Sequence, residues 1–170
     1  MTFLRAFVLI LATAPSQGWT AELQRYASPD KSYEATVVTL KTGESKIHIA
    51  KPHGKLFFEK SFESDDGEHG DTIIQAAWSP NSRFFVFMTQ HSGGHSPLMH
   101  PIYFWDRRDN QLRMLDYVVG GITGGFTIET PDIVRGKRIA SPDSTSADDQ
   151  DDFSISLTSA TKAYRRPAAR

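Results

Sequence analysis

Short apolar or alternating runs, separated by turn residues, recur along most of the chain. The clearest alternation, Phe-Ser-Ile-Ser-Leu at 153–157, predicts a strand with one face on a core and the other in water. Runs of this length that are rich in Val, Ile, Phe and Tyr are typical of β-strands. We expect strands at 33–40, 46–49, 56–62, 72–78, 83–89, 102–105, 111–115, 126–129, 133–139 and 153–157.

Helical patterns are scarce by comparison. Residues 21–26 could form one short turn of helix, and residues 112–119 fit either class. No connection holds the helix of 10–15 residues that a parallel crossover needs. The sequence therefore predicts an all-β fold, an antiparallel meander built as blade-like four-stranded sheets or as a sandwich.

Several connections carry the residues that tight turns require. Residues 41–44 and 52–55 each contain a Gly where a turn favours a positive φ, and residues 107–110 contain an Asp-Asn pair that tolerates the left-handed region. The Gly-rich segment 120–125 looks like a phosphate cradle. We expect it to be a flexible connector, because a strand and not a helix follows it.

Two runs are apolar at every position, at 84–88 and 102–105. A continuous apolar run predicts a strand that is buried on both faces, or one whose outer face meets a partner. A homo-oligomer is therefore one interpretation of these runs.

A short phrase recurs along the chain. Ser28-Pro29-Asp30 precedes one predicted strand, and Trp78-Ser79-Pro80-Asn81 precedes another 51 residues later. A weak echo, Ser141-Pro142-Asp143, follows after a further 62 residues. The chemistry is that of a turn, since Pro fixes φ and Asp or Asn bonds back to the backbone.

With its Trp-Ser-Pro-Asn phrase, the segment from residue 26 to residue 116 resembles the blades of β-propellers of the WD40, TolB and prolyl-oligopeptidase type, which often carry Trp-Ser-Pro-Asp-Gly. Ser82 stands where that phrase has Gly, and the first copy lacks both the Trp and the Gly. The resemblance implies blade-like four-stranded sheets and no particular activity. A ring of four blades needs at least ~160 residues, so the chain is too short for a full propeller. Turn chemistry alone, without a repeat, is the alternative reading.

The first 18 residues have the pattern of a signal peptide. Arg5 precedes an apolar stretch from Ala6 to Ala14, and Ser16 and Gly18 suit cleavage before Trp19. The alternative is a short buried N-terminal helix. We expect a periplasmic or secreted protein, and the absence of cysteine excludes a disulfide scaffold, a thiolate zinc site and a cysteine nucleophile.

Length and charge limit the remaining classes. The 170 residues suit one domain, and the net charge of −1 argues against a nucleic-acid binder. No apolar run is long enough for a transmembrane segment. We divide the chain into a signal peptide (1–18), a β domain (19–140), an acidic mobile loop (141–152), the last strand of the β domain (153–161) and a basic tail (162–170).

A Gly-rich loop holds three of the six histidines and is the strongest candidate site. We expect it to bind a small-molecule ligand or a protein partner, together with the aromatic strand that follows it, because Gly lets a ligand approach the backbone closely. The expected binding residues are His91, Gly93, Gly94, His95, His100, Tyr103 and Trp105.

A metal is the alternative for the same loop. His91, His95 and His100 could bind Zn or Cu, and Met99 adds a thioether for Cu(I), although their spacing matches no established metal signature.

The remaining candidate chemistry is weaker. Residues 63–71 hold five carboxylates, which could bind Ca²⁺ but lack the EF-hand register, so a solvated hairpin loop is expected. No motif of a serine hydrolase, a metalloprotease or a phosphate-binding loop is present. We therefore expect a non-catalytic binding protein without a cofactor. The alternative is a metal-binding protein or metal-dependent enzyme that uses the histidine loop.

Overall fold

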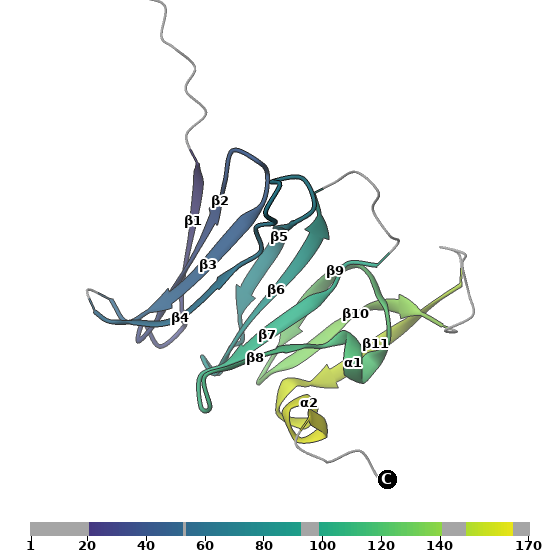
Figure 1. Ribbon diagram of the computed structural model, residues 1–170. Coiled ribbons are helices and arrows are strands. Elements are labelled where there is room, and N and C mark those ends of the chain that lie inside the picture. The colour runs from purple at the N-terminus through teal and green to yellow at the C-terminus, as the bar shows by residue number, and fades with distance from the viewer. Residues whose placement is uncertain (1–20, 53, 93–98, 141–148, 165–170) are drawn as a thin grey trace, which may run out of the picture.

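The computed structural model describes residues 21–52, 54–92, 99–140 and 149–164. These residues form three antiparallel sheets and two short helices, which confirms the all-β class (Figure 1). The signal peptide expected at 1–18 and the residues Gly93, Gly94 and His95 lie outside the described residues. Within the described part of the chain, no helix is long and apolar enough to cross a membrane.

Each sheet is a meander of strands that follow one another in sequence. The first sheet holds β1 (Glu22–Ala27), β2 (Glu34–Thr39), β3 (Ser45–Ala50) and β4 (Leu56–Ser61). The second sheet holds β5 (Asp71–Trp78), β6 (Phe84–His91), β7 (Ile102–Asp106) and β8 (Gln111–Met114). The third sheet holds β9 (Ile122–Glu129), β10 (Ile133–Ile139) and β11 (Gln150–Ser156). Helix α1 (Asp116–Val119) precedes the third sheet and α2 (Leu157–Tyr164) follows it.

The second sheet is the middle layer of the molecule, and the other two sheets cover its faces (Figure 1). Phe85, Phe87 and Trp105 belong to the core shared with the first sheet, whose members include Tyr33, Ala35, Val37, Ile47 and Ile49. Phe84, Val86 and Phe104 belong to the core shared with the third sheet and α2, whose members include Val134, Phe153 and Leu157. Each fully buried aromatic or aliphatic side chain contributes about 1.5–3 kcal/mol. The apolar runs of β6 and β7 are therefore buried by the chain itself.

The recurrent turns have the same hydrogen bonds in both copies. Ser28 Oγ accepts from the Tyr33 N–H at 3.0 Å, and Ser79 Oγ accepts from the Phe84 N–H at 2.9 Å. Lys31 and Ser82 take the equivalent position in each turn, with φ of 57° and 59°. This is the left-handed region, which explains why the resembling blades have Gly here.

A third turn occupies the same place between the first two strands of its sheet. Thr130-Pro131-Asp132 connects β9 to β10, and Thr130 lies 51 residues after Ser79. The echo expected at 141–143 lies outside the described residues. The Asn81 N–H donates to the Pro131 carbonyl at 3.2 Å, and the Asp30 N–H donates to Ser82 Oγ at 3.0 Å. The three turns are thus in contact at one end of the molecule.

Two segments have another secondary structure than expected. Residues 22–27 form strand β1 instead of a helical turn, because each of them pairs with β2. Residues 157–161 continue as α2 instead of the last strand, which ends at Ser156, since Leu157 and Ala160 are fully buried on the core side of a helix.

Three connections also differ from expectation. The Gly-rich segment 120–125 is a connector only up to Gly121, because β9 begins at Ile122 and pairs with β10. Gly54 has no positive φ, whereas Gly43 and Asn110 have the left-handed φ that their turns predicted. The acidic loop expected at 141–152 ends earlier, since Gln150 already belongs to β11.

Candidate functional site

A groove lies between the edge of the first sheet and the outer strands of the second. Its cavity volume is about 620 Å³, and β4, the segment after it, β7, β8 and both helices contribute to its lining. Four of the lining side chains are aromatic, and we call the site the aromatic groove after them: Phe62, Tyr103, Tyr117 and Tyr164.

The inner part of the aromatic groove is fixed by ring packing. Tyr103 stacks on the buried Phe87 with ring centroids 5.4 Å apart, and Phe62 lies 5.5 Å from Tyr103. Desolvation, with smaller contributions from the charges of Asp71 and Asp116, raises the pKa of Tyr103 to about 12. The phenol is therefore neutral at physiological pH and can donate a hydrogen bond.

The outer part of the groove is formed by the two helices. Tyr117 on α1 is 78% exposed, and its ring lies 6.3 Å from that of Tyr164 on α2, nearly perpendicular to it. The Tyr164 hydroxyl donates to the Met114 carbonyl, which holds the ring against β8. An exposed Tyr ring beside a hollow gives a ligand an apolar face with a polar tip.

Most charged groups in and around the groove are paired with one another, whereas Lys60 Nζ lies over the Phe62 ring, 5.5 Å from its centroid. Lys46 lies 2.5 Å from Glu63, and Arg113 lies 2.7 Å from Asp109. At the other end, His91 Nδ1 lies 3.5 Å from Asp71 Oδ1. These pairs leave the groove with little net charge.

A buried carboxylate orders the loop that borders the groove. Glu44 Oε1 accepts hydrogen bonds from Ser64 Oγ at 2.5 Å and from the Gly70 N–H at 2.7 Å. The bond from Ser64 is the main cause that lowers the pKa of Glu44. A Cβ on Gly70 would lie 2.2 Å from the Phe62 carbonyl oxygen and 2.4 Å from Glu44 Oε1, so only glycine fits here.

Asp66, one of the acidic residues of this loop, is held by hydrogen bonds within the loop. Asp66 Oδ2 lies 2.5 Å from His69 Nδ1, and Asp66 Oδ1 accepts from the Glu68 N–H at 3.0 Å. The Glu68 N–H, followed by Ser64 and His69, lowers the pKa of Asp66. Among the residues that the structure describes, no group of three His, Asp or Glu side chains could hold a metal ion.

The structure brings together only some of the residues expected at the site. His91 pairs with Asp71 of β5, which lines the groove together with Tyr103. The His100 N–H bonds instead to the Ile122 carbonyl of the third sheet. Trp105 is 1% exposed within the core, where its indole N–H donates to Asn110 at 2.8 Å, so it presents no surface to a ligand.

Sequence analysis missed several residues of the groove. Phe62 was assigned only to a strand, Tyr117 lies in the ambiguous segment 112–119, and Tyr164 lies in the expected tail. They meet Tyr103 only through long-range packing, and no local pattern connects them. His69 could have been noticed as the one imidazole in the acidic loop; its ring lies 6.3 Å from that of His91.

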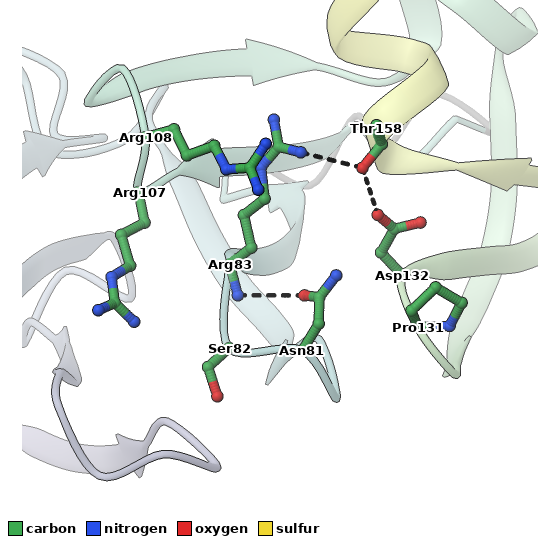
Figure 2. Close-up of a pocket in the computed structure, with 8 residues that line it drawn as sticks. All are labelled: Asn81, Ser82, Arg83, Arg107, Arg108, Pro131, Asp132 and Thr158. Atoms are coloured by element: carbon green, nitrogen blue, oxygen red, sulfur yellow. Dashed lines mark hydrogen bonds between the residues drawn. The ribbon is translucent and has the colours of Figure 1, made fainter.

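A second hollow, of about 550 Å³, lies beside the stacked turns (Figure 2). Arg83 donates to both oxygens of the fully buried Asp106, at 3.0 and 2.6 Å, and to the Thr158 hydroxyl at 3.0 Å. Thr158 in turn donates to Asp132 at 2.5 Å. This chain of bonds connects the second sheet to the third sheet and α2, and we assign it a structural role.

Comparison of the sequence with known protein families and with curated proteins, and of the structure with solved structures, gave no match. The candidate site is therefore argued from its own geometry.

Proposed function

We propose that the protein is an exported, non-catalytic binding protein whose ligand occupies the aromatic groove. The observation that carries the proposal is the groove itself: a hollow of about 620 Å³ with four aromatic side chains, one of them 78% exposed. Concave sites with aromatic walls and a few polar groups are the usual form of ligand pockets.

The charges indicate the class of ligand. Because Glu63 and Arg113 have ion-pair partners and Lys60 lies over the Phe62 ring, a charged ligand would have to compete with these contacts. An uncharged ligand with an apolar face and hydroxyl or amide groups fits better, since it can stack on Tyr117 and bond to the neutral phenol of Tyr103.

The polar groups near the groove support binding over catalysis. Among the described residues that line it, no serine hydroxyl is hydrogen-bonded to an imidazole. Ser64 bonds to Glu44 and Asp66, and the His69 ring bonds to Asp66. A nucleophile would need an adjacent base of this kind.

The groove is tested by mapping small molecules on the ¹⁵N-labelled protein. We expect phenol and glucose, added separately at millimolar concentration, to shift backbone signals next to Tyr103, Tyr117 and Tyr164. Tyr117→Ala should reduce these shifts, whereas Ile74→Ala, which removes an exposed apolar side chain outside the groove, should not. Shifts that cluster at Arg83 and Asp132 instead, or that persist in Tyr117→Ala, would contradict the proposal.

Export and metal binding need separate measurements. The mass of the mature protein should correspond to a chain that begins at Trp19. Metal analysis of tag-free protein tests the alternative function. Stoichiometric Zn or Cu that is lost in the double variant His91→Ala/His95→Ala would favour the metal-binding protein over the proposal made here.

A further inference from the structure

Within the described residues, the third sheet has three strands and the other two sheets have four each. In the first and second sheets a fourth strand, β4 or β8, pairs antiparallel with the outer edge of the third strand. In the third sheet β11 holds the corresponding place, and the chain then turns into α2. The outer edge of β11 is therefore where a fourth strand would lie.

Helix α2 packs away from this edge. Its buried residues Leu157 and Ala160 belong to the core between the second and third sheets. Its last residue, Tyr164, contacts Phe104 and donates to the Met114 carbonyl, both in the second sheet. The helix thus runs toward the second sheet, and no strand of the described residues pairs with the outer edge of β11.

Main-chain hydrogen bonds show which groups of β11 face outward. The Leu157 N–H bonds to its pairing partner Asp132 at 3.0 Å, and the Ala140 N–H bonds to Asp149 at 3.0 Å. Since hydrogen-bonded pairs alternate along an antiparallel ladder, residues 151, 153 and 155 also bond to β10. The N–H and C=O groups of Gln150, Asp152, Ser154 and Ser156 then face the open edge. Among the described residues, no strand pairs with this edge.

We propose that this edge binds an extended segment of a partner polypeptide as the fourth strand of the third sheet, and that the segment carries Lys or Arg. The main chain of β11 supplies the hydrogen bonds, as in other cases of strand addition. Asp149, Asp151 and Asp152 place negative charge along this edge strand. Lys137 and Arg138 lie opposite Asp152 and Asp151 on β10, but within the described residues none of the three Asp side chains forms an ion pair. Basic side chains beside Asp151 and Asp152 would complement that charge.

The acidic side chains also protect the edge in the absence of a partner. Charged residues on an edge strand oppose unspecific pairing with other chains. An acidic edge thus favours a basic strand. In β11, Phe153 faces the core and Ser154 faces solvent, so the incoming strand should be apolar on the side of Phe153.

Binding is tested with a blocked peptide that alternates Lys with Val and a matched peptide with Glu in place of Lys. The Lys peptide should slow hydrogen exchange at the amides of Asp152 and Ser154 at least tenfold, and the Glu peptide should not. Asp152→Asn, on the solvent face shared with Ser154, should weaken binding up to about fivefold, as expected for one exposed ion pair.

Two variants at one position separate the edge from other surfaces. Ser154→Pro removes an N–H that faces outward and leaves the ladder to β10 intact, so it should abolish peptide binding. Ser154→Thr keeps the N–H and should bind like the wild type. If Ser154→Pro does not fold, a Lys peptide N-methylated at alternate residues replaces it and should fail to bind the wild type.

Other occupants of the edge would overturn the proposal. A dimer that Ser154→Pro dissociates would assign the edge to a second copy of the chain. Amides of Asp152 and Ser154 that exchange slowly in the monomer, but rapidly after deletion of residues 165–170, would assign it to the chain's own C-terminal segment. Equal binding of the Lys and Glu peptides would contradict the proposed preference for a basic segment.

Discussion

Among the described glycines, Gly70 leaves the least room for an added Cβ. A Cβ there would collide with the Phe62 carbonyl and the Glu44 carboxylate, and both of these hold the loop beside the aromatic groove. We expect Gly70→Ala to destabilise the protein by about 1–3 kcal/mol, the usual cost of overpacking a tight site. Urea denaturation measures this cost.

Gly54→Ala is the matched control for that variant. Gly54 has no positive φ, and the nearest atom to its added Cβ would be the Lys51 Cβ at 3.2 Å. Its effect should stay within about 0.5 kcal/mol, as for ordinary surface positions. Equal losses in both variants would mean that the loop tolerates a side chain at position 70.

Lys31 is strained by the turn that it belongs to. Its φ of 57° lies in the left-handed region, which costs a residue with a Cβ about 1–2 kcal/mol. Lys31→Gly removes that strain but adds backbone entropy to the unfolded chain, so we expect a net stabilisation of up to about 1 kcal/mol. Lys51→Gly, at an exposed position without a positive φ, should destabilise instead.

In the second turn, Ser82→Gly should stabilise the protein less than Lys31→Gly does in the first. The φ of 59° at Ser82 is equally unfavourable, but its hydroxyl accepts from the Asp30 N–H and thereby connects the first two turns. Thermal unfolding should rank Lys31→Gly above Ser82→Gly. The opposite order would show that the contact between the turns contributes little.

At the scale of elements, most strands could be predicted because their own residues carry the pattern. Alternation along β2 and β3 and continuous burial along β6 follow directly from their positions in one or two cores. Strand β1 is an edge strand that is exposed at five of its six positions, so only its pairing with β2 makes it a strand. Helix α2, with Thr and Ser among its eight residues, owes its form to packing against β8 and the core.

The aromatic groove was beyond prediction for a related reason. Its residues come from six elements and one connection, and Phe62 and Tyr164 are 102 positions apart in the sequence. The histidine loop was noticed because its residues are neighbours in the sequence. In the fold the main chain of His91 pairs with β5 of its own sheet, whereas the His100 N–H bonds to the Ile122 carbonyl of the third sheet.

A buried ion pair lies where the second sheet meets the third sheet and α2. Arg83 is the only described cation bonded to Asp106, which is fully buried. Arg83→Ala would leave that carboxylate without its partner, at a cost of about 3–5 kcal/mol. Arg107→Ala is the matched control, because its pair with Asp30 is partly exposed and worth about 0–1 kcal/mol. Denaturation curves that show equal losses would contradict the structural role assigned to Arg83.

At the scale of the whole molecule, the middle sheet belongs to two cores at once. Phe87 lies in the core shared with the first sheet and Phe84 in the core shared with the third, and both are fully buried on one strand. Neither outer sheet can lose its packing without exposing a face of β6. We therefore expect the three sheets to unfold as one cooperative unit, with equal calorimetric and van't Hoff enthalpies.

Two substitutions on β6 test this cooperation from opposite sides. Phe84→Ala and Phe87→Ala should each lower stability by about 3–5 kcal/mol through the cavity that they leave. Because one strand carries both side chains, each variant should shift the same single calorimetric transition to lower temperature. A second transition that appears in only one variant would mean that an outer sheet unfolds independently, and that the open edge of β11 belongs to a separable unit.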